Sequence, residues 1–124
     1  MIAVLDDDES VRKALVRLLG AAGHAACGFA TGRDFLDSWR IAPPDCLVLD
    51  LQMSGLTGLE VHQALNEAAA TFPVIIVTAH VAASMREDAM RHGAVAYLSK
   101  PVDAGVLMNA VMFAATFNPI LSEP

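Results

Sequence analysis

The sequence predicts an α/β fold in which five parallel strands form one doubly wound sheet, with helices on both faces. Two observations lead to it. Short, nearly continuous apolar runs alternate with longer segments of helical period, as is typical of strands that are buried on both faces. Five such pairs fit within 124 residues, the size of one ordinary domain. Right-handed crossovers leave few topologies, and the strand order 2-1-3-4-5, that of flavodoxin-like folds, is the common one.

The expected elements follow one another regularly. Strands are predicted from the apolar runs at 2–5, 25–29, 46–49, 74–77 and 95–98. The first helix is predicted from apolar residues that share one face, and it ends near Gly20 to Gly23; these residues are Val11, Leu15, Leu18 and Leu19. The second helix, 31–40, ends before Pro43-Pro44, and the third, 58–69, is followed by Phe72-Pro73. The last two helices are expected at 82–92 and 103–116.

Composition and charge narrow the classes of function. Apolar residues make up 55% of the chain and charged residues 18%, which indicates a globular fold. A net charge of −6 without a basic stripe argues against nucleic-acid binding by this chain. No apolar run approaches the ~18 residues of a membrane span, and no signal peptide precedes residue 1, so we expect a cytoplasmic protein with no membrane contact. Cys27 and Cys46 lie in apolar runs and are expected to be reduced core residues.

Polar side chains follow four of the predicted strands. The first strand runs into the acidic cluster Asp6 to Glu9, the third ends at Asp50, the fourth at Thr78, and the fifth is followed by Lys100. The carboxyl ends of parallel strands meet at one edge, where doubly wound sheets bind ligands. Carboxylates ~4 Å apart repel by about 4 kcal/mol, so such a cluster favours a hard cation such as Mg²⁺. Carboxylates, Mg²⁺, a lysine and a hydroxyl together suit phosphoryl transfer, and a carboxylate can itself accept the phosphoryl group.

Four motifs carry a resemblance to a known family: "VLDDDESVRKAL", "CLVLDLQMSGLTGLE", "VIIVTAH" and "GAVAYLSKPV". Over essentially its whole length the chain resembles the receiver domain of bacterial two-component response regulators, of the FixJ-like type. The resemblance implies a receiver domain at 1–117, with 118–124 as a tail or the start of a linker. It also implies a signalling switch that catalyses only its own phosphorylation and dephosphorylation, and is not otherwise an enzyme. Its partner would be a sensor histidine kinase or a phosphotransfer protein.

The resemblance also implies a role for each site residue. Asp50 would be the phosphoacceptor, and Asp6, Asp7, Asp50 and the backbone carbonyl of Gln52 would hold Mg²⁺, for which Mn²⁺ could substitute. Thr78 and Lys100 would bind the phosphoryl oxygens, and the side chain of Tyr97 would follow that movement. The bond between Lys100 and Pro101 is usually cis in the family.

Two features of the site loops are specific to this chain. Ser54 stands where the family usually has proline, so the loop after Asp50 lacks one backbone restraint. Gln52 and His80 each lie two residues beyond a site residue, where receivers have side chains beside the path of the attacking water. We expect these two to tune the lifetime of the phosphorylated state.

The last predicted helix has no charged side chain between 104 and 116 and is apolar on more than one face. Such a helix usually meets another surface. We expect a homodimer or an output contact through the face of segments 82–92, 95–98 and 103–116. The alternative is that residues 118–124 cover this helix.

Two other functions remain open from the sequence. One is a receiver-like interaction module that is never phosphorylated. The other is a haloacid-dehalogenase-like phosphatase, for which Asp6, Asp8 and Ser10 match the first motif. Against the phosphatase, this chain has no acidic pair after Lys100, where that family needs metal ligands, and 124 residues leave no room for its usual cap. Asp50 would also have no role in it. His24, His62 and His92 show no spacing of metal ligands and are expected to be surface or partly buried residues.

Overall fold

Five strands and five helices alternate along the chain in the computed structural model, which describes residues 1–79 and 82–117. The strands are β1 (Ile2–Leu5), β2 (Ala26–Phe29), β3 (Cys46–Leu49), β4 (Val74–Thr78) and β5 (Ala96–Ser99). The helices are α1 (Glu9–Ala21), α2 (Gly32–Ser38), α3 (Gly58–Glu67), α4 (Ala83–Arg91) and α5 (Ala104–Ala114). The predicted elements are all present, and their ends differ from the predicted ones by at most two residues.

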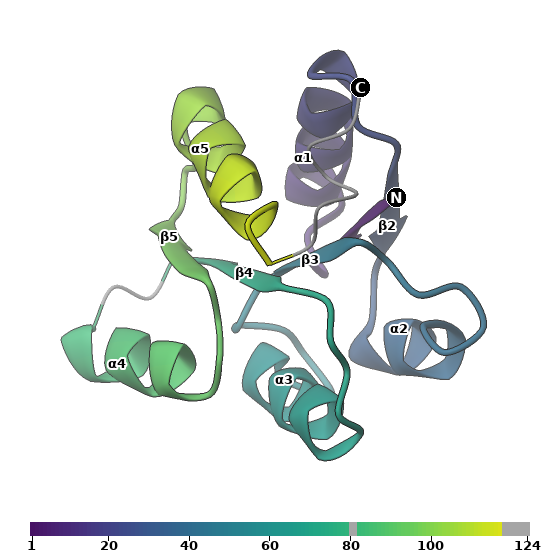
Figure 1. Cartoon of the computed structure of the whole chain (residues 1–124), viewed down its shortest axis with the longest axis vertical. Coiled ribbons are helices and arrows are strands. Elements are labelled where there is room, and N and C mark those ends of the chain that lie inside the picture. Colours follow the sequence, from purple (N-terminus) through teal and green to yellow (C-terminus); the bar gives the residue numbers. More distant parts are fainter. Residues whose placement is uncertain (80–81, 118–124) are drawn as a thin grey trace.

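The strands form a single parallel sheet in the order β2-β1-β3-β4-β5, which confirms the predicted fold. Helices α1 and α5 cover one face of this sheet, and α2, α3 and α4 cover the other (Figure 1). The chain therefore winds in both directions from the centre of the sheet. Its winding reverses between β1 and β3, and the carboxyl ends of these neighbouring strands meet there.

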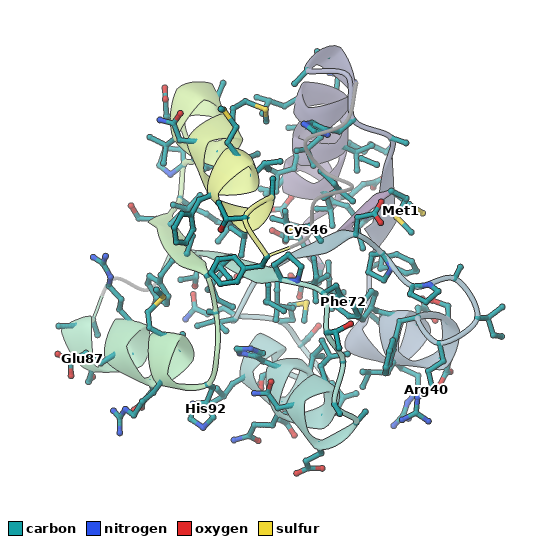
Figure 2. The ribbon with its side chains drawn as sticks, in the orientation of Figure 1. Met1, Arg40, Cys46, Phe72, Glu87 and His92 are labelled. Atoms are coloured by element: carbon teal, nitrogen blue, oxygen red, sulfur yellow. The ribbon has the colours of Figure 1, made fainter. Side chains whose placement is uncertain are left out.

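Alternation along the strands gives the sheet two separate apolar layers. In β1, Ile2 and Val4 pack on the side of α1 and α5, whereas Ala3 and Leu5 pack on the side of the other three helices. The central strands β1, β3 and β4 are buried throughout. Cys46 and Phe72 lie in the interior of the molecule, and Arg40, Glu87 and His92 lie at its periphery (Figure 2).

Side-chain caps fix where several helices begin. Asp8, Thr31, Thr57 and Asp103 each accept a hydrogen bond from the backbone N–H three residues later. At α3 the cap is reciprocal, because the Glu60 side chain also accepts from the backbone N–H of Thr57. A cap of this kind stabilises a helix by about 1 kcal/mol. The caps of α1 and α3 are important for the site, because these helices follow the two strands whose ends carry the acidic side chains.

Two expectations about single residues were wrong. Cys27 is exposed because β2 is an edge strand, with β1 as its partner in the sheet. His62 is buried, with only 2% of its surface exposed, because it lies on the inward face of α3 with Val61 and Leu65. Burial, and to a smaller extent the charge of His92, lowers the pKa of His62. No helix among the described residues is long and apolar enough to cross a lipid bilayer.

Candidate acidic site for cation binding and phosphoryl transfer

Three carboxylates meet at the carboxyl ends of β1 and β3. One oxygen each from Asp6, Asp7 and Asp50 lies within 4.8 Å of the others. Asp6 and Asp50 are buried, with 1% and 4% of their surface exposed, whereas Asp7 is exposed. The sequence predicts that these three acids converge, and the structure brings them together.

Lys100 places one ammonium group between two of these acids. Its Nζ lies 2.8 Å from Asp6 Oδ2 and 3.2 Å from Asp50 Oδ2. Burial alone would lower the pKa of Lys100, but the hydrogen bonds and charges of Asp6 and Asp50 outweigh it and raise this pKa. Burial, together with the charge of Asp6, raises the pKa of Asp50, although the Gln52 N–H and Lys100 oppose this shift. One cation therefore faces two buried acids, and the site is short of positive charge.

The surroundings of Asp6 fit a bound cation. Asp6 Oδ1 accepts a hydrogen bond from the Asp8 backbone N–H at 2.9 Å, which fixes the carboxylate. Asp6 Oδ2 is buried, and among the described residues it accepts no hydrogen bond of regular geometry. It contacts Lys100 Nζ as an ion pair. Carboxylate oxygens are the ligands that Mg²⁺ prefers. The donor set and its unmet negative charge thus suit a hard divalent ion.

The loop after β3 holds Asp50 in place. The backbone N–H of Asp50 donates to Leu5 O at 3.0 Å, and the Gln52 N–H donates to Asp50 Oδ1 at 3.1 Å. Gly58 begins α3 against this backbone, because a Cβ at this position would lie 1.9 Å from Asp50 O and 2.6 Å from Leu51 Cα. Only glycine allows α3 to start so close to the backbone of Asp50 and Leu51.

The other expected site residues lie on β4 and β5 and directly after β5. Thr78 is fully buried at the end of β4, and its carbonyl accepts the Lys100 N–H at 2.9 Å. The peptide bond between Lys100 and Pro101 is cis. Tyr97 is half-buried on β5, opposite Ile76, and packs against the apolar layer of α2, α3 and α4. The backbone of Thr78 thus bonds to the backbone of Lys100, the residue whose side chain pairs with Asp6 and Asp50. His80, expected to tune the lifetime, lies outside the described residues.

Ser54 makes a contact that was not predicted from the sequence. Its backbone N–H donates to Asp7 Oδ2 at 3.0 Å, and its Oγ lies 3.3 Å from the same oxygen. The two residues are 47 positions apart, so spacing along the chain could not reveal the contact. The one available signal was chemical, because serine donates from both groups and the proline usual in this position donates from neither.

The comparison with known families identifies the chain. The model of the response regulator receiver domain matches residues 2–112. The chain belongs to this family. Receiver domains are signalling modules of two-component systems with the general function of a phosphorylation switch, and the family generally uses Mg²⁺.

Several relatives resemble this receiver domain. The transcriptional regulatory protein FixJ of Azorhizobium caulinodans is 36% identical over 110 residues, covering 89% of this chain and 52% of that protein. The transcriptional regulatory protein TdiR of Thauera aromatica is 35% identical, covering 98% of this chain and 54% of that protein. The receiver domain thus spans about half the length of these two relatives. A solved response regulator receiver protein from Burkholderia phymatum is 42% identical with a TM-score of 0.81, covering 93% of this chain and 94% of that one.

Proposed function

We propose that Asp50 accepts a phosphoryl group from the phosphohistidine of a sensor histidine kinase or a phosphotransfer protein. The observation that carries this proposal is the convergence of Asp50 with Asp6, Asp7 and Lys100 at the end of β3. A carboxylate oxygen of Asp50 attacks the phosphorus atom, and the bond from phosphorus to the imidazole nitrogen breaks. The electron pair of that bond stays on the imidazole, which then takes up a proton.

Charge at the site explains what the other residues contribute. Asp6 and Asp7 would hold Mg²⁺ together with Asp50 and the Gln52 carbonyl, and Mn²⁺ could replace it. The positive charge of the ion would neutralise the phosphoryl oxygens during transfer. Lys100 would move from Asp50 to a phosphoryl oxygen, and the Thr78 hydroxyl would donate to another. This proposal is supported by the two ion pairs of Lys100, whose Nζ lies 2.8 Å from Asp6 Oδ2 and 3.2 Å from Asp50 Oδ2, beside the acceptor carboxylate.

The proposed output surface consists of α4, β5 and α5. Exposed apolar side chains on or next to these helices are Met90, Val106, Met112, Phe113 and Phe117. Phosphorylation would change this surface through Thr78 and Tyr97 and so control homodimer formation or an output contact. FixJ and TdiR are transcriptional regulators, so we propose that the output is control of transcription through a partner or domain that this surface contacts. The chain itself would not bind DNA, and 118–124 would be a tail or the start of a linker.

The lifetime of phospho-Asp50 is proposed to depend on Gln52 and His80. Gln52 is exposed and two residues beyond Asp50, with its backbone tied to the acceptor carboxylate. The expected result for Gln52→Ala and His80→Ala is a changed decay rate of the phosphorylated protein with phosphorylation itself retained. If both variants decay at the wild-type rate, this part of the proposal is wrong.

Incubation with acetyl phosphate and Mg²⁺, followed by intact-mass spectrometry, tests the main proposal. A receiver gains one acid-labile phosphoryl group, and chelation of Mg²⁺ prevents the gain. No gain under any condition would instead indicate an interaction module that is independent of phosphorylation. Release of phosphate over many turnovers, abolished by Asp6→Asn but not by Asp50→Asn, would indicate a phosphatase.

A further inference from the structure

Asp7 differs from the other two acids of the site in its partner, which is Ser54 and not Lys100. Lys100 pairs with Asp6 and Asp50, and within the described part of the chain no ion pair joins it to Asp7. Asp7 is instead contacted by two donors of Ser54, the N–H at 3.0 Å and the hydroxyl at 3.3 Å, both on Oδ2. Hydrogen bonds to an ionised acceptor are the stronger kind. Ser54 therefore offsets part of the charge of Asp7, the one carboxylate of the three that Lys100 does not pair with.

The contact also joins two segments that are distant in sequence. Asp7 lies between β1 and α1, and Ser54 lies in the segment between β3 and α3, next to Gly55 with its left-handed backbone (φ 73°). A divalent ion and the two Ser54 donors are both attracted to the negative charge of the Asp7 carboxylate, and both fix its orientation. A carboxylate that donors already hold is a weaker ligand, because part of its charge is satisfied before the ion arrives.

We propose that Ser54 is a positioning residue that competes with the divalent cation for Asp7, so that cation binding releases the segment 51–57 from Asp7. This inference rests on the proposed cation site of Asp6, Asp7 and Asp50. It adds a consequence specific to this chain: the affinity for the cation is lower than the three carboxylates alone would give. Cation binding would also change the position of the segment just before α3, because Ser54 would no longer be held by Asp7.

Isothermal titration with Mg²⁺ measures the competition. Ser54→Ala removes the hydroxyl contact and keeps the N–H, and we expect its Kd for Mg²⁺ to fall by a factor of roughly two to five. Ser54→Pro removes both donors, and its Kd is expected to fall further, by a factor of about ten. Ser38→Ala is the matched control, because it removes a hydroxyl that bonds Phe35 O at the far end of α2. Its Kd should equal that of the wild type.

The exchange rate of the Ser54 amide proton, measured by NMR, gives a second readout without any substitution. The competition predicts faster exchange in the protein saturated with Mg²⁺ than in the chelated protein. Equal or tighter Mg²⁺ binding by wild type than by both Ser54 variants, or an amide that Mg²⁺ protects, would overturn the proposal. A wild-type protein that binds no Mg²⁺ would instead refute the proposed cation site itself.

Discussion

Replacing Asp50 with Asn should stabilise the fold in the absence of metal. The side chain keeps its shape and its oxygen for the Gln52 N–H, but it loses a buried charge. The direction of the pKa shift of Asp50 shows whether its charge stabilises or destabilises the fold. Burial, helped by Asp6, raises the pKa of Asp50, which means that the ionised form is less favourable in the folded protein than in the unfolded chain.

The distances in the site set the size of this effect. At an effective dielectric near 20, the repulsion between Asp6 and Asp50 within 4.8 Å is at least about 3.5 kcal/mol. The attraction between Lys100 and Asp50 at 3.2 Å is about 5 kcal/mol on the same basis. Together these two terms leave a net attraction of at most about 1.5 kcal/mol. Burial of the Asp50 charge opposes folding by several kcal/mol and outweighs it. The expected net gain is about 1–2 kcal/mol, or roughly 4–8 °C in Tm.

Guanidinium unfolding of wild type and Asp50→Asn in chelator, followed by circular dichroism, tests this prediction. The gain should be complete at neutral pH, above the raised pKa of Asp50 that burial produces. It should vanish as the pH falls through that folded-state pKa toward the unfolded value near 3.8, because Asp50 is then protonated in both states. A variant that is less stable than wild type at neutral pH would refute the reasoning that the site is short of positive charge.

Three further substitutions probe the same architecture by chemical unfolding. Lys100→Met leaves Asp6 and Asp50 without their shared cation and should destabilise the metal-free fold by about 3 kcal/mol; unchanged stability would contradict the charge balance. Gly58→Ala should lower stability by about 3 kcal/mol, because its Cβ would lie 1.9 Å from Asp50 O; a neutral effect would mean that α3 can shift freely. Thr57→Ala removes the reciprocal cap of α3 and should lower stability by about 1 kcal/mol, with wild-type stability as the contrary result.

The fold and most of the site follow from the sequence because they depend on short-range patterns. Apolar runs predict the strands, and the polar residue after each run, such as Asp50 or Thr78, predicts what the sheet brings to its edge. Strand order then requires only the handedness of the crossovers. Nothing else is needed to predict that Asp6 and Asp50 lie together.

The remaining features depend on contacts between distant segments or on which face of an element is covered. The contact of Ser54 with Asp7 requires the loop after β3 to turn toward the end of β1. Cys27 is exposed because it lies on an edge strand. This could not be predicted, because an apolar run looks the same in an edge strand and in a central one. The burial of His62 depends on how α3 is rotated against the sheet, which a single histidine in a helical pattern does not reveal.

Chemical mapping of the phosphorylated residue tests the central claim most directly. The protein is first treated with acetyl phosphate and Mg²⁺. Borohydride then reduces an aspartyl phosphate to homoserine, and peptide mass spectrometry finds the position of the homoserine. We predict homoserine at position 50 alone, and none in protein treated without Mg²⁺ or in Asp50→Asn. Homoserine at position 6 or 7 instead of 50, or equal modification in the chelated protein, would contradict the account.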